Sequence, residues 1–244
     1  MSRFAPRRAD DVTNLIRNTV LGLITTHDEQ GYIATPLPLL AETDDAGAVR
    51  AIIGHFARAN PHVARAQATP RALIVFLGAH GYIGPTAVSK LGWAPTWNYQ
   101  LAQFEVEIDF EPANNAAAIR ALVEAMEGHG ADAWTVERMG ARFGRLVSHV
   151  VAFRARVIHD TARFKLGQDE DPATFAEIIE ALGDGPLSRA MLEQAPGNFR
   201  SPPGEARNHS HSIVQIQLKL LILRINIAFR RTKTDYWLVK MLRF

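Results

Sequence analysis

Residues 92–100, with the sequence GWAPTWNYQ, combine aromatic rings with hydrogen-bonding groups in a pattern that suits a flat ligand. In an extended chain Trp97 and Tyr99 point to one side, whereas Thr96 and Asn98 point to the other. The rings can stack on an aromatic ligand, and the hydroxyl and the amide can read the carbonyl and N–H edge of a heterocycle. The alternative is an aromatic corner that plugs the end of a barrel.

A second candidate site contains an arginine that follows a predicted strand. His55 and Arg58 come after the apolar run at residues 48–54, and Asn60 with Pro61 indicates a turn into a helix. An arginine beside the backbone amides of a helix start can bind an anion. The alternative is a solvated arginine next to an Asx turn.

A third candidate is the sequence RFKLGQ at residues 163–168. Arg163 and Lys165 alternate on one strand face, and Gln168 follows them closely. Two cations on one face can clamp a phosphate or a partner's carboxylates. The alternative is an edge strand that carries charge to prevent aggregation.

Several other kinds of site are excluded by the sequence. The chain has no cysteine, which excludes disulfides, thiolate nucleophiles and cysteine-bound metals. Glycines 78, 81 and 84 have the spacing G-x-x-G-x-x-G, whereas a dinucleotide loop requires G-x-G-x-x-G. The nine histidines are scattered, so no metal site is predicted. No G-x-S-x-G elbow is present. No residue stands out as a catalytic acid, base or nucleophile.

The elements that must position these residues follow from the apolar pattern. Alternation and turn signals predict strands at residues 21–27, 32–40, 48–56, 71–78 with a continuation after a glycine break at 80–85, 100–110 and 148–159. Pro36 and Pro38 remove ladder donors, which places their strand at an edge or a bulge. Residues 161–171 are predicted as a polar connector.

Predicted helices lie between and after these strands. A short helix capped by Asp10 or Asp11 opens the chain, another starts near Pro61, and the rest are expected at residues 114–127 with an Asn cap, 135–147, 172–183 and 185–194. Several strands come first and no βαβ order repeats. The sequence therefore predicts an α+β fold, an antiparallel β-barrel with peripheral helices, rather than a doubly wound sheet.

The composition changes near residue 196. We predict a domain at 1–195, a Pro/Gly/Ser-rich linker at 196–212 and a basic, apolar tail of uncertain structure at 213–244. Residues 207–244 have eight basic side chains and one acid, a net charge of +7, which leaves −5 on the other 206 residues. The charges and amides inside residues 213–229 argue against a membrane span. Added structure, a membrane-surface segment and a stretch foreign to the domain remain open for the tail.

At this point four segments, taken in order, resemble the PaiB family, whose members are described as FMN-binding negative transcriptional regulators. The first segment is TTHDEQGYIATPLPLL and the second is GHFARANPH. The third combines GYIGP, VSK and PTWNY, and the fourth is RFKLGQ. The resemblance covers roughly residues 4–192. It implies the FMN-binding split barrel, a homodimer, and FMN at the subunit interface. The flavin-site residues that it implies are Arg58, Asn60, Thr96, Trp97, Asn98, Lys165 and Gln168, with His55 and Tyr82 close by.

The resemblance implies a regulator or flavin sensor, and two other functions remain. One is a flavin-dependent oxidoreductase that uses NAD(P)H, because a fold does not fix a function. The other is a non-flavin barrel that binds haem or serves as a scaffold, because a shorter loop at residues 84–88 replaces an aromatic family segment. DNA is a conceivable partner, but the charge of −5 on the body does not support it. The lack of cysteine and of a secretory signal leads us to expect a cytoplasmic protein.

Overall fold

The computed structural model describes residues 2–130, 132–195 and 197, and these contain a closed six-stranded antiparallel barrel. The strand order around the barrel is β1-β2-β3-β6-β5-β4, and β4 pairs back with β1. The strands are β1 (Leu21–Asp28), β2 (Gly31–Thr43), β3 (Val49–Ala57), β4 (Arg71–Ile83), β5 (Thr96–Phe110) and β6 (Val150–Lys165). The predicted α+β barrel is confirmed. The predicted linker and tail lie outside the described residues, apart from residue 197.

Apolar side chains at every second position fill the inside of the barrel. On β5, Phe104, Val106 and Ile108 are buried, while Glu105 and Asp109 between and beyond them are exposed. The centre contains an aromatic cluster. In it the rings of Phe56 and Phe153 are 5.1 Å apart, and those of Phe76 and Phe104 are 6.2 Å apart. The predicted alternation on β5 therefore marks the barrel core.

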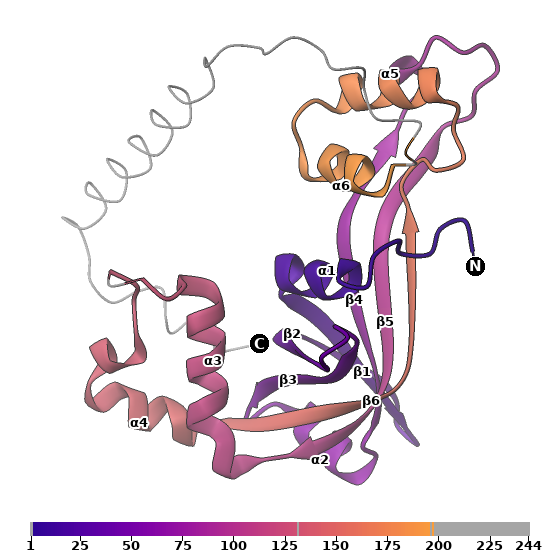
Figure 1. Cartoon of the computed structure of the whole chain (residues 1–244). Helices are drawn as coiled ribbons and strands as arrows, with labels where there is room; N and C mark the ends of the chain where they lie inside the picture. The colour runs from indigo at the N-terminus through magenta and orange to yellow at the C-terminus, as the bar shows by residue number, and fades with distance from the viewer. Residues whose placement is uncertain (1, 131, 196, 198–244) are drawn as a thin grey trace, which may run out of the picture. The chain divides into compact units, whose positions relative to one another are not determined.

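Strands β4, β5 and β6 are longer than the barrel and continue past it as a three-stranded extension toward α5 and α6 (Figure 1). β6 pairs with β3 only from Val150 to Arg156, whereas it pairs with β5 as far as Lys165. A register shift between Leu77 and His80 on β4 accompanies the extension, at the glycine break seen in the sequence. The extension therefore has two faces that are independent of the barrel interior.

The helices cover one face of the extension and parts of the barrel wall. They are α1 (Asp11–Thr19), α2 (Pro61–Ala68), α3 (Asn115–Glu127), α4 (Ala141–Ser148), α5 (Pro172–Leu182) and α6 (Pro186–Gln194), with short 3₁₀ turns η1 (Pro85–Ala87), η2 (Pro112–Asn114) and η3 (Val136–Met139). Among these, α6 contacts β4, α1 contacts β4 and β2, and α3 contacts β3. No helix within the described residues is long and apolar enough to cross a membrane.

Capping side chains explain where two of the helices begin. Asn60 accepts a hydrogen bond from the His62 amide at 2.9 Å, and Asp171 accepts one from the Thr174 amide at 2.9 Å. The start of α1 differs from the prediction, because neither Asp10 nor Asp11 caps the helix through its side chain. The Asp11 carboxylate instead accepts hydrogen bonds from backbone amides that precede the helix.

Two further predictions need correction, and a third holds in part. Strand β2 pairs with both β1 and β3 along its length, so it is an edge strand only over the half that contains the prolines. Pro36 and Pro38 are tolerated because they lie in the half of β2 that pairs only with β1. The predicted connector at 161–171 is strand as far as Lys165, because its polar side chains are exposed on the extension. No Asn side chain caps α3, and Asn115 bonds instead to the Val150 carbonyl at 3.0 Å.

A buried histidine ties α2 to the barrel. His62 is fully buried, and its two ring nitrogens lie 3.0 Å from the Thr26 hydroxyl and 2.8 Å from the Thr35 hydroxyl. Its pKa is lowered, first by desolvation and then by the positive charge of Arg65. His62 is therefore neutral in the folded protein, whereas a histidine in the unfolded chain takes up a proton near pH 6.5.

We predict that acid destabilises the protein through this residue. Because the folded-state pKa of His62 is lowered, its contribution to stability is complete above pH 6.5 and is lost as the pH falls below that value. One extra proton in the unfolded state changes the unfolding free energy by up to about 1.4 kcal/mol per pH unit. Urea unfolding at pH 7.5, 6.5 and 5.5 measures the slope, which His62→Gln should reduce and His129→Gln, at an exposed position, should not. An equal slope in the wild type and in His62→Gln would contradict the prediction.

Candidate flavin site

The far ends of β4 and β5 present exposed aromatic rings side by side. Tyr82 pairs with Trp97, and their rings are 6.0 Å apart. Tyr82 is 53% exposed and Trp97 is 56% exposed, so two large neighbouring rings face water. His80 stacks on Trp97 at 6.5 Å with an angle of 26° between the ring planes. This open face of the extension can accept a flat ring.

A lysine completes the open face. Lys165 at the end of β6 pairs with Tyr99, and its ammonium donates hydrogen bonds to the Thr96 hydroxyl and, at 2.8 Å, to the Trp97 carbonyl. These two bonds hold the positive charge beside the exposed rings. The structure thus brings Tyr82, Thr96, Trp97 and Lys165 together, all of which the sequence predicts for the site.

Asn98 and Gln168 have structural roles in the described chain. Asn98 is 2% exposed, and its amide donates to the Met191 sulfur at 3.5 Å, beneath α6. Of the two rings predicted on one side of residues 96–99, Trp97 is exposed and Tyr99 is half-buried, while the Asn98 amide is packed under α6 rather than offered to a ligand. Gln168 closes the turn after β6, because its amide bonds to the Leu166 N–H at 2.8 Å and to the Phe164 carbonyl at 2.6 Å.

Arg58, Asn60 and His55 lie at the other end of the barrel. The Arg58 guanidinium donates to the carbonyls of Ser148 at 3.0 Å and Val150 at 2.8 Å, at the start of β6. Lys165 is fifteen residues further along the same strand, a length of about 50 Å at roughly 3.3 Å per residue. Within one chain, therefore, Arg58 and Lys165 do not bind the same phosphate.

His55 is packed against the barrel wall rather than at either cation. It lines a small cavity with Ala118 and Leu122 of α3. Its Nδ1 atom is buried and has no hydrogen-bond partner among the described residues, and desolvation lowers the pKa of the ring. Of the nine predicted residues, four form the open face, two are structural neighbours of it, and Arg58, Asn60 and His55 lie apart.

The loop between β4 and β5 is fastened to the start of α5. The Ser89 hydroxyl and amide both donate to Glu177, and the Lys90 ammonium is 2.9 Å from the Asp171 carboxylate. The Trp93 indole N–H donates to Glu170 at 3.1 Å. The pKa of Asp171 is well below its usual range, first because it accepts the Thr174 amide bond and then because it accepts one from Lys90. This loop fixes the approach to Thr96 and Trp97.

Sequence reasoning did not select His80 for this face. A signal was present, because His80 is two residues before Tyr82 and alternation puts both on one side of β4. The glycines at residues 78 and 81 instead indicate a break in the strand, which hides the alternation. Among the described residues, no group of three or more His, Asp or Glu side chains could hold a metal ion.

An antiparallel six-stranded barrel with a strand extension and an open aromatic face defines a protein of the split-barrel class. The family described as "Putative FMN-binding domain" matches residues 1–159 of the 244. The chain belongs to this family. The expectation of a PaiB-like, FMN-binding protein is confirmed, and its cofactor is FMN.

Two known proteins illustrate the range of similarity. "Protease synthase and sporulation protein PAI 2" of Bacillus subtilis (strain 168) is 26% identical over 194 residues, which cover 78% of this chain and 92% of that protein. The solved structure of the FAD and haem binding protein from Mycobacterium smegmatis matches with a TM-score of 0.53 and 13% identity, over 88% of this chain and 97% of that one. At that identity the second likeness shows the fold alone.

The residues of the open face fit FMN chemically. A phosphate needs a cation, which Lys165 supplies, and the isoalloxazine needs a flat aromatic face, which the exposed Trp97 supplies, with the tilted Tyr82 ring beside it. The Lys165 ammonium has three N–H donors, and two of them bond to Thr96 and Trp97. One donor is therefore left for a ligand.

We predict that FMN affinity depends on Trp97 and Lys165. Trp97→Ala and Lys165→Gln should each weaken FMN binding about tenfold or more, since stacking on an aromatic ring and a charge-assisted hydrogen bond each contribute about 1–3 kcal/mol. Quenching of flavin fluorescence during titration measures the affinity. Trp134→Ala and Arg71→Gln are matched controls outside the open face and should bind FMN like the wild type. Unchanged affinity in Trp97→Ala and Lys165→Gln would show that FMN binds elsewhere.

Proposed function

We propose that this protein binds FMN between two copies of its chain and acts as a flavin-dependent regulator or flavin sensor. The observation that carries the proposal is the open face of the extension, where Trp97 and Tyr82 are more than half exposed beside the Lys165 ammonium. Exposed rings next to a cation on one side of a sheet are a suitable half of a flavin site. A second surface has to cover the other side of the ring.

An apolar surface on the outside of the barrel supports the proposal that two copies of the chain associate. Leu23 of β1 pairs with Val75 of β4, so Leu21 and Leu77, two residues away along each strand, lie on the same face. Leu21, Leu23 and Leu77 are 56%, 42% and 49% exposed. Grouped apolar side chains on the surface of a protein mark an interaction site. A dimer through this face would bury them.

The separation of the two predicted cations supports the same arrangement. Arg58 and Lys165 are at opposite ends of β6, so a flavin phosphate held by both has to lie between chains. In the proposed complex Lys165 and the Arg58 of the other copy bind the phosphate, while Trp97 and Tyr82 orient the ring. FMN, when bound, supplies one- and two-electron redox chemistry. The chain's own residues bind it, orient it and limit its contact with water.

A regulatory role fits better than a named reaction. The Bacillus relative is named for protease synthesis and sporulation, which are cellular processes rather than chemical conversions. The sequence offers no evident catalytic acid, base or nucleophile. Direct DNA binding by residues 1–206 is not part of the proposal, because their net charge of −5 opposes the approach of a polyanion.

We predict that the apolar face and FMN binding are linked. Leu23→Glu places a charge in the proposed interface, so it should convert a dimer into a monomer and weaken FMN binding at least tenfold. Light scattering after size exclusion measures the mass, and fluorescence titration measures the affinity. Leu91→Glu is the matched control, because Leu91 is 98% exposed in the β4–β5 loop and away from that face. A Leu23→Glu protein that stays dimeric and binds FMN normally would rule out this interface.

Turnover separates the regulator from an oxidoreductase. The FMN-loaded protein should oxidise NADH and NADPH no faster than the same concentration of free FMN, since no residue is assigned to proton transfer. The loss of absorbance at 340 nm measures the rate. Saturable oxidation of either nucleotide, reduced in Trp97→Ala, would replace the proposed function with a flavin-dependent oxidoreductase.

A further inference from the structure

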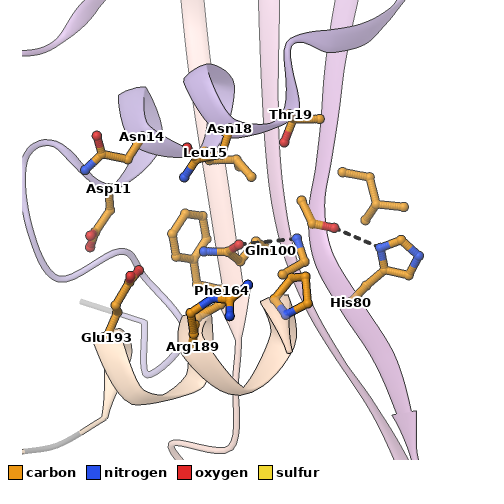
Figure 2. A pocket seen from close by; sticks show the side chains of 15 residues that line it. Asp11, Asn14, Leu15, Asn18, Thr19, His80, Gln100, Phe164, Arg189 and Glu193 are labelled. Atoms are coloured by element: carbon orange, nitrogen blue, oxygen red, sulfur yellow. Dashed lines mark hydrogen bonds between the residues drawn. The ribbon is translucent and has the colours of Figure 1, made fainter. Parts of the chain in front are cut away.

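A cavity of about 660 Å³ lies between α1, α6 and the strands β4 and β5 (Figure 2). Its volume is in the range of small-molecule sites. None of the nine residues predicted for the flavin lines it. It is formed mainly by the helix-covered side of the extension, since its strand floor includes Ala79, Gln100 and the buried ring of Phe164.

Of the two charged residues of α6 on the cavity wall, only one forms an ion pair. Arg189 and Glu193 are four residues apart on α6, a spacing at which the two side chains can form an ion pair. Instead, the Arg189 guanidinium is 2.7 Å from the Asp184 carboxylate. Among the described residues Glu193 has no ion-pair or hydrogen-bond partner for its side chain. The nearby Arg8 guanidinium is 3.0 Å from Asp10 and 3.7 Å from Asp11, and the Glu193 charge acts on it only as a weaker, longer-range attraction. The wall therefore has an exposed carboxylate that forms no ion pair with a described residue.

A buried acceptor lies next to one of the cavity residues, Asp11. Gln194, which does not itself line the cavity, is 2% exposed, and its amide nitrogen donates to the Asp11 carboxylate at 2.7 Å. Because an ionised carboxylate only accepts, this fixes the orientation of the amide, and among the described residues the Gln194 Oε1 atom is buried without a partner.

The remaining wall is partly polar and partly apolar. Figure 2 shows Asp11, Asn14 and Asn18 on α1 above the cavity and Glu193 on α6 below it. The Asn18 and Thr19 side chains make no hydrogen bond within the described chain, so they are free for a ligand. Leu15, Phe164 and Ala190 are buried and form an apolar floor. A matching ligand has a positively charged donor at one end and an apolar body.

We propose that this cavity binds a small organic ammonium ion with a short aliphatic body. The ammonium group donates to the Glu193 carboxylate and to the oxygen atoms of Asn18 and Thr19. The aliphatic body packs against Leu15 and Phe164. The charge of the wall selects a cation over an anion of the same size, because Arg189 is already neutralised by Asp184. This site contains none of the nine residues predicted for the flavin, although its lining shares His80 with the open face and Leu77 with the proposed interface, and its test does not depend on the proposed function.

Calorimetric titration of the full chain with three probes of equal length tests the proposal. The probes are n-hexylamine, hexan-1-ol and hexanoate. We expect n-hexylamine to bind with one site per chain, hexan-1-ol at least tenfold more weakly, and hexanoate not at all. Hexanoate that binds as tightly as n-hexylamine, or n-hexylamine that gives no saturable heat, would overturn the proposal.

Two variants and a control locate the binding. Glu193→Gln keeps the shape of the side chain and removes its charge, so n-hexylamine affinity should fall at least tenfold. Asn18→Trp fills the cavity from an exposed position on α1 and should also abolish binding. Glu180→Gln makes the same charge change on the exposed side of α5, outside the cavity, and should leave affinity unchanged. Equal affinity in the wild type and in Glu193→Gln would refute the site. Circular dichroism of each variant verifies that it is folded.

Discussion

The structure depends on the unequal pairing of β6. This strand must close the barrel against β3, yet it pairs with β3 only over residues 150–156 and with β5 as far as residue 165. Once β3 ends, the outer half of β6 has one strand neighbour, and the Phe4 carbonyl accepts a hydrogen bond from the Phe164 amide at 2.8 Å beside it. The strands β4, β5 and β6 therefore leave the barrel together, and every candidate residue on the open face is located in this extension.

The three-stranded extension has two faces, one covered by helices and the other exposed. One face is covered by α1 and α6, which bury Phe164, Asn98 and Leu166. Close packing there requires glycine: a Cβ atom at Gly78 would come within 2.2 Å of the Leu15 side chain, and one at Gly81 within 2.9 Å of Leu187. The other face exposes aromatic rings that a stable monomer has no reason to leave in water. This asymmetry is the physical argument for the proposed flavin site on the open face.

The strands and helices could be predicted from local sequence patterns, because each pattern involves only residues that are close together in the sequence. Alternation on β5, the proline at the start of α2 and the apolar run of β4 each indicate an element directly. Pairing could not be predicted in this way. Pro36 and Pro38 indicate an edge, yet whether β2 has one or two neighbours depends on where β3 begins to pair, and that depends on the whole barrel. The strand at residues 161–165 was missed for the same reason, since exposed polar residues resemble a connector.

The candidate site shows the same limit more clearly. Residue types gave three separate candidates, and only the family resemblance grouped Thr96, Trp97 and Lys165, which the structure places as neighbours across β5 and β6. The resemblance also grouped Arg58 with Lys165, although a whole strand separates them within one chain. A sequence identifies the cationic residues but does not give the distance between them in the folded protein. Only the register of β6 with β3 and β5 shows that one chain cannot bring the pair to one phosphate.

His80 connects the two faces of the extension. Its ring stacks on Trp97 of the open face, while the residue is also one of those that line the cavity. The bond from its Nδ1 atom to the Gly78 carbonyl anchors it at the register shift of β4, where the strand leaves the barrel. A ligand in the cavity and a flavin ring on Trp97 would therefore both contact groups that determine the position of one imidazole. Any coupling between the two sites has its shortest physical route through this residue, because the rest of the sheet between them is paired backbone with close-packed side chains.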